Sequence, residues 1–162
     1  MNIYIFDLDS TLANIDHRLP HLHTRDDGPD APFNALCVKD TPILHMIDIF
    51  NNLRMTSNIC VIWTGRTEGV RSQTAYWLHG NTDLNLNEII NPKTTNDHDM
   101  QTLKMRPLGD TRPDFIIKQE WLLSLEPWQR ERIVCAFDDR DRVVKMYRAN
   151  GVPCLQVAEG NF

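Results

Sequence analysis

The segment Ile3-Tyr4-Ile5-Phe6-Asp7-Leu8-Asp9-Ser10-Thr11 joins a short apolar run to two aspartates one residue apart. The run is β-branched and aromatic, which is typical of a buried central strand in a parallel sheet. Side chains alternate along an extended chain, so Asp7 and Asp9 can lean the same way. Carboxylates at the carboxyl end of such a strand, where ligands bind, repel each other unless a cation or a proton separates them, and Mg²⁺ is the natural cation. The motif alone also fits a turn before a helix N-cap.

Length and composition predict one globular domain, 1–162, in a chain of 162 residues. No apolar run approaches the roughly 20 residues that span a bilayer, so we expect no membrane. A core strand at the N-terminus leads us to expect no signal peptide and a cytoplasmic location. The four cysteines are widely spaced, which favours buried or semi-buried thiols in a reducing compartment over a zinc site. They are Cys37, Cys60, Cys135 and Cys154.

The net charge of −5 argues against a general nucleic-acid binder, because nonspecific affinity comes from neutralising many phosphates. Local clusters of arginine and lysine could still hold one phosphate or the end of a chain. The sequence points to no obligate protein partner.

Apolar periodicity predicts strands and helices in alternation after the first strand. We expect strands over 58–63, 102–106, 132–137 and 152–157, and helices over 41–54, 67–79, 86–90, 114–125 and 141–149. Thr41 and Pro42 suit the N-cap and first position of their helix, and Gly80 suits the end of the next one. Pro153 indicates that the last strand lies at a sheet edge. The alternation predicts a three-layer α/β fold with a mainly parallel sheet and right-handed crossovers.

Two segments lack this periodicity. Residues 14–40 read as a flap or cap-like insertion after the first strand, and residues 81–101 as a loop-rich insertion. The flap contains His17, His21 and His23, which could be read as metal ligands. No cysteine or glutamate lies at a recognisable ligand spacing from them, which favours ordinary loop histidines.

Two later strands also end in polar residues. Thr64-Gly65-Arg66 follows the second strand, where a hydroxyl, a glycine amide and a guanidinium can bond a phosphate oxygen. Asp138-Asp139 follows the third, and Lys118 lies in the helix before it. Taken singly, each has a plainer interpretation. Thr64 can be a cap in a strand-to-helix turn, Lys118 a solvated helix charge, and the acidic pair a helix N-cap with a surface ion pair.

The ordered set of Asp-x-Asp-x-Thr, a strand-end threonine, a helical lysine and a late acidic pair resembles the haloacid dehalogenase (HAD) superfamily of phosphohydrolases. Further segments resemble the 3′-phosphatase module of phage polynucleotide kinase-phosphatases, over nearly all the chain except 14–40 and 81–101. These segments are Gly109-Asp110-Thr111-Arg112, Ile117-Lys118-Gln119-Glu120, Phe137-Asp138-Asp139-Arg140 and the tail 151–158. The phosphate-binding loop of the kinase half is absent from this sequence. Ser10 stands where glycine is frequent in the superfamily.

The resemblance implies a Rossmann-like HAD fold and a division of catalytic roles. Asp7 would be the nucleophile that forms an aspartyl-phosphate, and Asp9 the general acid and then the general base. Thr64 and Lys118 would hold the transferring phosphoryl oxygens, and Lys118 would also neutralise Asp7.

The resemblance also implies a magnesium site and a substrate grip. Mg²⁺ would lie between Asp7, the backbone carbonyl of Asp9 and Asp138, and Asp139 would orient the metal waters. The substrate-binding residues would be Arg66 and Arg106, which match the two substrate arginines of the family, with the amide of Gly65 beside them. Arg106 could instead simply pair with Asp110.

Three functions are compatible with these residues. The first is a Mg²⁺-dependent 3′-phosphatase acting on a nucleic-acid end, in the host cytoplasm if the protein is phage-encoded. The second is a phosphatase of nucleoside monophosphates or other small phosphate esters, which the net negative charge and the missing kinase half favour. The third is an inactive module that binds phosphate ends, which would have no need of the acid/base Asp9.

Overall fold

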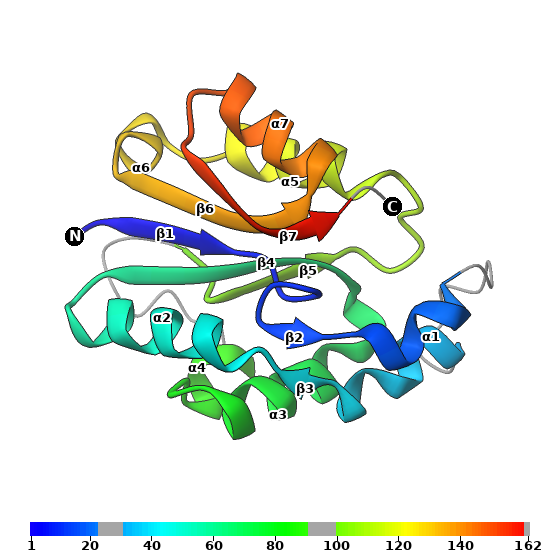
Figure 1. Ribbon diagram of the computed structural model, residues 1–162. Helices are drawn as coiled ribbons and strands as arrows, with labels where there is room; N and C mark the ends of the chain where they lie inside the picture. The colour runs from blue at the N-terminus through cyan, green and yellow to red at the C-terminus, as the bar shows by residue number, and fades with distance from the viewer. Residues whose placement is uncertain (23–30, 91–99, 161–162) are drawn as a thin grey trace.

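The computed structural model describes residues 1–22, 31–90 and 100–160, and its centre is a five-stranded sheet (Figure 1). The strand order is β5-β4-β1-β6-β7, and every neighbouring pair is parallel. The apolar β1 is therefore the central strand, and β7, which follows Pro153, lies at an edge. The predicted parallel α/β fold is confirmed. The strands are β1 (Ile3–Phe6), β4 (Ile59–Thr67), β5 (Leu103–Arg106), β6 (Ile133–Arg140) and β7 (Cys154–Gly160).

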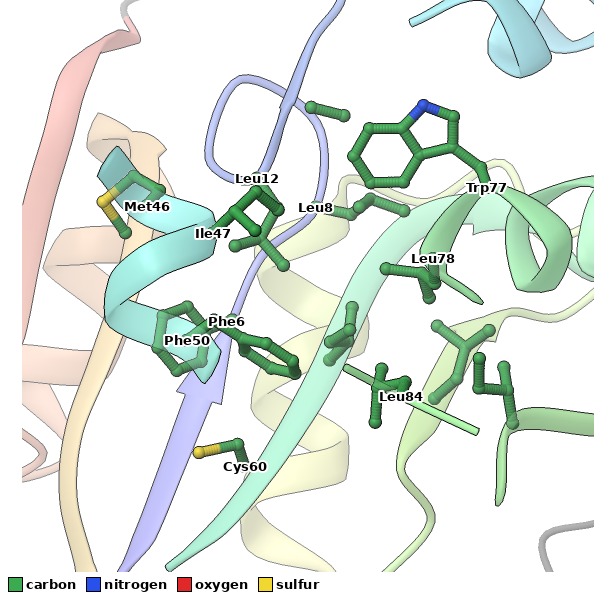
Figure 2. Packing of buried hydrophobic residues seen from close by; sticks show 14 of the residues in the cluster. Phe6, Leu8, Leu12, Met46, Ile47, Phe50, Cys60, Trp77, Leu78 and Leu84 are labelled. Carbon is green, nitrogen blue, oxygen red and sulfur yellow. The ribbon is translucent and has the colours of Figure 1, made fainter. Parts of the chain in front are cut away.

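Helices cover both faces of this sheet, which gives the three predicted layers (Figure 1). One face carries α2 (Leu44–Met55), α3 (Arg71–Asn81) and α4 (Leu86–Ile90). The other carries α5 (Asp114–Leu123), α6 (Pro127–Glu131) and α7 (Asp141–Ala149). In the α2 layer, Phe6 of β1 meets Phe50 edge-on, with 5.1 Å between ring centroids (Figure 2). Phe6 also stacks on Phe137, with 4.4 Å between ring centroids. In the α5 layer, Trp63 packs edge-on against Trp121 at 5.8 Å.

The segment after β1 forms a small group of short elements beside the carboxyl edge of the sheet, in addition to the three layers. It contains the two-stranded antiparallel pair β2 (Ala13–Asn14) and β3 (Thr41–Pro42), the 3₁₀ helices η1 (Asp16–His21) and η2 (Leu36–Lys39), and α1 (Pro32–Ala35). These elements are too short to give a periodic signal in the sequence, which is why residues 19–35 of the predicted flap show no apolar periodicity. The predicted flap is thus ordered on both sides of residues 23–30, which lie outside the described residues, as does His23. We call the described part, 13–22 and 31–42, the flap.

One helix start was predicted wrongly. Thr41 and Pro42 are not the N-cap and first turn of α2 but strand β3, which pairs with Asn14 and Ala13. The amide of Ile43 then donates to the carbonyl of Leu12 at 2.8 Å, so the chain stays extended and α2 begins at Leu44. Local capping preference was overridden by pairing with a segment nearly thirty residues earlier.

Both ends of α3 differ from the prediction, and one short helix was not predicted. Gly80 lies inside α3, which begins after the 3₁₀ turn Glu68–Val70 and ends at Asn81. A Cβ on Gly80 would meet nothing within 4 Å, so no contact requires glycine here, and the helix does not end at this residue. α6 was missed; it is a one-turn helix that Glu126 and Gln129 close with a capping box. The predicted short helix 86–90 is confirmed, whereas 91–99 of the second insertion lie outside the described residues.

β4 and β6 are both longer than their apolar cores. β4 pairs with β5 as far as Thr67 and Arg106, and β6 pairs with β7 as far as Arg140 and Gly160, each with a register shift near the end. The polar residues that the sequence places after the strands therefore lie within them. Sheet hydrogen bonds hold these residues at fixed positions along the carboxyl edge.

Backbone constraints appear at two points of this edge. Ser10 has a φ of 59°, in the left-handed region that favours glycine, which accounts for the glycine frequent at this position in related sequences. A Cβ on Gly160 would lie 2.3 Å from the carbonyl oxygen of Asp139, so the end of β7 can approach the acidic pair only as glycine.

All four cysteines are buried and unbridged, as predicted. No helix within the described ranges has the length and apolarity to cross a membrane.

Candidate active site

The predicted site residues converge on the carboxyl edge of three adjacent strands. Asp7 and Asp9 follow β1, Thr64 to Arg66 belong to β4, and Asp138 with Asp139 belong to β6. Because β1 lies between β4 and β6, its two aspartates stand between the other two groups. The side chain of Lys118 reaches the same edge of the sheet from α5 and is almost fully buried.

Asp7 belongs to a buried charged cluster with Lys118, Asp138 and Asp139. The ammonium of Lys118 lies 2.6 Å from Asp7 Oδ1 and 2.7 Å from Asp138 Oδ2, so it bridges the two strands. Burial works against the charged lysine, but the carboxylates of Asp138 and Asp7 outweigh it and raise the pKa of Lys118 well above its ordinary value. The lysine is therefore a fixed cation, and its predicted contact with Asp7 is present.

Asp139 is the unsatisfied member of this cluster. Both of its carboxylate oxygens are buried and have no hydrogen-bond partner among the described residues. Burial, followed by the charge of Asp138, raises the pKa of Asp139 to about 7. Burial is also the main reason that the pKa of Asp7 lies well above its ordinary value; Lys118 opposes the shift, and the neighbouring carboxylates add to it. One lysine does not balance three buried carboxyl groups.

The missing charge fits a hard divalent cation. Asp7, Asp138 and Asp139 each offer a carboxylate oxygen, and these atoms lie within 4.8 Å of one another. An all-oxygen set with orphaned, buried acceptors is the kind of site that Mg²⁺ occupies in proteins. The carboxylate of Asp9 turns away from this group, so its backbone carbonyl is what Asp9 would offer to a metal.

Asp9 has the opposite electrostatic environment. Its Oδ1 lies 2.7 Å from Nη2 of Arg18 and 2.8 Å from Nε of Arg66. Burial favours the neutral acid, but the two guanidinium groups outweigh it and lower the pKa of Asp9. Two aspartates one residue apart thus have pKa values moved in opposite directions.

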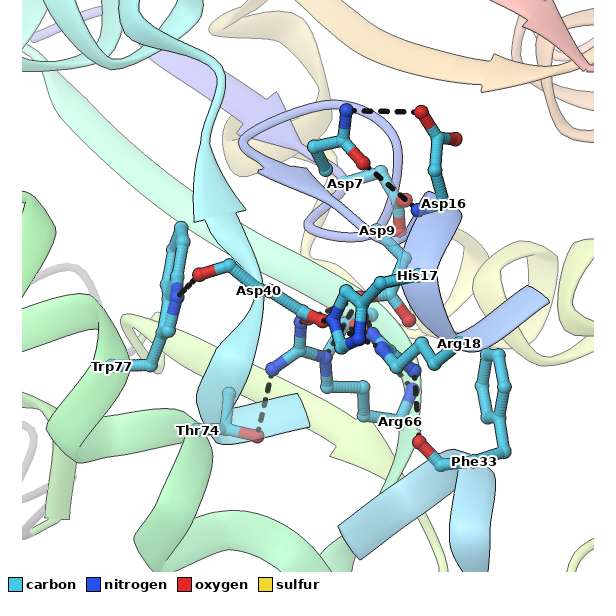
Figure 3. Close-up of polar contacts among 12 residues, drawn as sticks. Asp7, Asp9, Asp16, His17, Arg18, Phe33, Asp40, Arg66, Thr74 and Trp77 are labelled. Carbon is cyan, nitrogen blue, oxygen red and sulfur yellow. Dashed lines mark hydrogen bonds and ion pairs between the residues drawn. The ribbon is translucent and has the colours of Figure 1, made fainter. Parts of the chain in front are cut away.

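A second carboxylate, Asp40, holds the same two arginines from the flap side (Figure 3). It accepts hydrogen bonds from Nε of Arg18 at 2.8 Å and Nη2 of Arg66 at 2.5 Å, and His17 Nε2 lies 2.8 Å from it. The indole of Trp77 donates to its backbone carbonyl at 2.7 Å. Asp40, Arg18 and Arg66 are all buried, so this network ties the flap to β4.

Sequence reasoning missed both Arg18 and Asp40. They lie 22 residues apart in a segment with no period and no known motif, so their pairing leaves no local signal. Sequence reasoning took Arg66 as a substrate contact. The structure places it in the cavity wall but already paired with Asp9 and Asp40.

The other predicted substrate contacts lie at the β4–β5 side of the site. Thr64 is fully buried, and its hydroxyl accepts the backbone amide of Arg66 at 3.2 Å. Gly65 lines the cavity, and its carbonyl accepts Nε of Arg106 at 2.9 Å. Nη1 of Arg106 donates to the backbone carbonyl of Asp110 at 3.1 Å, so the two residues do meet, but through the main chain. Arg106 therefore holds the loop after β5 in place through these hydrogen bonds, and it also lines the cavity.

A further ion pair was also missed. Asp114 lies one helical turn before Lys118, and its Oδ2 accepts a hydrogen bond from Nη1 of Arg140 at 3.0 Å. The i, i+4 spacing of Asp114 and Lys118 places both on one side of α5, which could have shown that Asp114 lies near the site but not that it pairs with Arg140.

Part of this set lines one cavity of about 550 Å³: Asp7, Asp9, Gly65, Arg66, Arg106, Asp114 and Arg140. Thr64, Lys118, Asp138 and Asp139 are buried next to these residues but are not part of the cavity lining. Asp7 and Asp9 lie in its wall, the flap contributes Leu22 and Phe33, and the first residues of α7 form another side. The cavity is large enough for a ligand with more than one functional group.

A parallel sheet whose central strand leads into paired aspartates, with a lysine and a second acidic pair beside them, defines a HAD-type fold. The family model described as the polynucleotide kinase PNKP phosphatase domain matches residues 1–162, so the chain belongs to that family.

Solved structures share the fold. One, titled "Structure of Pnkp1/Rnl/Hen1 complex", has a TM-score of 0.73 and 24% identity over 100% of this chain and 48% of that chain. Another, the "Pnkp1/Rnl/Hen1 RNA repair complex", has a TM-score of 0.72 and 24% identity over 100% of this chain and 44% of that one. The chain thus spans about half the length of these proteins. Protein tyrosine kinase A of Mycobacterium tuberculosis is more distant, with a TM-score of 0.55 and 15% identity over 99% of this chain and 87% of that one.

Proposed function

We propose that this protein is a Mg²⁺-dependent phosphomonoesterase that removes a 3′-phosphate from the end of a polynucleotide. The observation that carries the proposal is the buried position of Asp7, held by Lys118 beside an acidic pair and open to a cavity. Membership of the PNKP phosphatase-domain family supports the same reaction.

In the first half-reaction, a carboxylate oxygen of Asp7 attacks phosphorus and forms an aspartyl-phosphate. The bond from phosphorus to the 3′ oxygen breaks, and that oxygen takes a proton from Asp9. Arg18 and Arg66 both contact Oδ1 of Asp9, so a proton on Oδ2 would leave these contacts intact. The substrate's negative charge would raise the pKa of Asp9 and so offset the lowering by Arg18 and Arg66.

In the second half-reaction, Asp9 takes a proton from water as the water oxygen attacks phosphorus. The phosphorus bond to Asp7 breaks, inorganic phosphate leaves, and both aspartates return to their first state. Lys118, already beside Asp7, stabilises charge on the phosphoryl oxygens throughout. Thr64 would hold a second phosphoryl oxygen, and Arg66, Arg106 and the amide of Gly65 would contact the substrate.

The residues that would hold Mg²⁺ are Asp7, Asp138 and the backbone carbonyl of Asp9, with Asp139 beside them. When bound, the ion would offset the repulsion between the carboxylates and a phosphate dianion. The unpaired oxygens of Asp139 support this assignment, because buried acceptors without partners are costly.

Asp139→Asn should stabilise the metal-free protein and remove its response to magnesium. At pH 8 the Asp139 carboxyl, with a pKa of about 7, is mostly charged and buried without a partner. Each kcal/mol gained raises Tm by roughly 2–4 °C in a protein of this size. Thermal unfolding with and without 10 mM MgCl₂ measures both effects, and the exposed Asp48→Asn is the control. A metal-free variant that melts below the parent, with its Mg²⁺ shift intact, would contradict the assignment.

A substrate panel tests the proposed function itself. The net charge of −5 keeps small phosphate esters, such as nucleoside monophosphates, as the alternative substrate class. We expect Mg²⁺-dependent release of phosphate from a 3′-phosphorylated oligonucleotide, faster than from a 3′- or 5′-mononucleotide. A preference for mononucleotides would establish the alternative. Activity that survives full chelation, or binding without turnover of any substrate, would refute the proposal.

A further inference from the structure

The cavity is larger than a phosphoryl group needs. Its volume of about 550 Å³ falls within the range of roughly 300–1,000 Å³ that pockets for multi-part ligands occupy. Asp7 and Asp9 border it, so a phosphate there leaves most of the space to the remainder of the substrate.

Most of the basic side chains around this cavity are already engaged. Arg66 is paired with Asp9 and Asp40, and Arg140 with Asp114. Arg112 is held by Asp110 and Glu120, and Arg106 by main-chain carbonyls. These guanidinium groups are held by their partners and form part of the cavity wall.

Two basic residues of the cavity lining differ from the others. Arg142 and Lys145 are exposed, and no ion pair involves either of them in the part of the chain that the structure describes. They lie three residues apart on α7, which places them on one side of the helix, one turn from the other. α7 follows directly on Asp138 and Asp139, so this basic pair begins where the acidic cluster ends.

The flap adds apolar surface to the same cavity. Leu22 and the half-buried ring of Phe33 line it together with Asn34, and the guanidinium of Arg18 lies 4.3 Å from the ring centroid. Exposed basic side chains and an aromatic surface in one cavity fit a single strand, whose phosphates bind the basic groups and whose bases stack on the ring.

We propose that Arg142 and Lys145 bind the internucleotide phosphate on the 5′ side of the terminal nucleotide and so make this a site for a polymer rather than a mononucleotide. This inference rests on the proposed phosphatase function. A mononucleotide 3′-phosphate has no such internucleotide group, so the pair distinguishes the two substrate classes. The net negative charge of the protein does not oppose this, because the attraction is local to the cavity mouth.

The test compares Arg142→Gln/Lys145→Gln with Arg130→Gln/Arg132→Gln. The control variant loses the same charge. Arg130 lies in the last turn of α6 and Arg132 directly before β6, so both lie at the amino edge of the sheet, whereas the cavity lies at the carboxyl edge. Substrates are a 3′-phosphorylated oligothymidylate and thymidine 3′-monophosphate, with Mg²⁺ present. We expect the first variant to lower the ratio of kcat/KM for oligomer over mononucleotide by about tenfold at low salt, through KM. The dependence of log KM on log salt should lose about 0.7 from its slope, since the pair neutralises one phosphate and each neutralised phosphate of a single strand contributes about 0.7.

Failure of this inference is distinguishable from failure of the function. A parent that hydrolyses the oligomer, together with equal ratios and salt slopes in the two variants, would overturn the role of Arg142 and Lys145 and leave the phosphatase in place. A parent that ignores the oligomer would overturn both. Binding of the 3′-phosphorylated oligomer to the same variants in an Asp7→Asn background, measured by fluorescence anisotropy, checks the contact without turnover. Unchanged affinity there would also refute it.

Discussion

Asp7→Asn is expected to lower phosphatase activity by roughly 10⁴–10⁶-fold, the scale seen when a catalytic nucleophile is removed. An amide cannot form the phosphoenzyme, so both half-reactions stop. The fold should persist, because burial already favours a neutral group at this position and Lys118 keeps its contact with Asp138. Circular dichroism and thermal unfolding check the fold, and the exposed Asp48→Asn provides a matched amide substitution.

Asp9→Asn should fail in a different way. The nucleophile remains, and the amide oxygen can still accept from Arg18 and Arg66, but the proton donor and base are gone. A nitrophenolate leaves as a stable anion, so nitrophenyl phosphate should give a burst equal to one turnover, followed by slow release of phosphate. A sugar alcohol needs protonation and should lose about 10²–10⁴-fold at the first step. A burst in Asp7→Asn with none in Asp9→Asn would reverse the two roles.

Asp40→Asn has the largest expected effect on stability, and it acts on activity as well. Asp40 accepts hydrogen bonds from the buried guanidinium groups of Arg18 and Arg66. Removing one partner of a buried ion pair typically costs about 3–5 kcal/mol, because the other partner stays desolvated. At roughly 2–4 °C per kcal/mol, Tm should fall by about 10 °C.

The control for this substitution is Asp83→Asn. Asp83 also accepts from an arginine, Arg54 at 2.8 Å, but on the surface, where such a pair is worth about 0–1 kcal/mol. Because Arg18 and Arg66 also position Asp9, Asp40→Asn should slow the oligonucleotide more than nitrophenyl phosphate, whose leaving group needs no proton. If both variants melt at the same temperature, the network does not anchor the flap. If both substrates slow equally, Asp40 does not act through Asp9.

The central sheet could be predicted because its signals are local. Each strand is an apolar run, and the residues that matter chemically follow Phe6, Trp63 and Phe137 without a gap. Chain direction alone then brings Asp7, Thr64 and Asp138 to one edge. The acidic cluster follows from this, since β1 lies beside β6 in the sheet.

The flap side of the site could not be predicted in the same way. Asp40 meets Arg18 only because β2 and β3 pair, and those strands are two residues long. Thr41 and Pro42 have strong helix-start preferences that this pairing overrides. No local pattern indicates that Arg66 is held by two carboxylates, because Asp9 follows a different strand and Asp40 belongs to the flap.

The four buried thiols give the molecule internal reporters of its own opening. They are distributed over different parts of the fold: Cys37 in η2 of the flap, Cys60 in β4, and Cys135 and Cys154 on the paired strands β6 and β7. A thiol reagent can reach them only when the covering structure opens, so each labelling rate measures a local unfolding equilibrium. Faster labelling of Cys37 than of the others would show that the flap opens while the sheet stays closed. Opening of the flap could then be measured in the unaltered protein, without adding a probe.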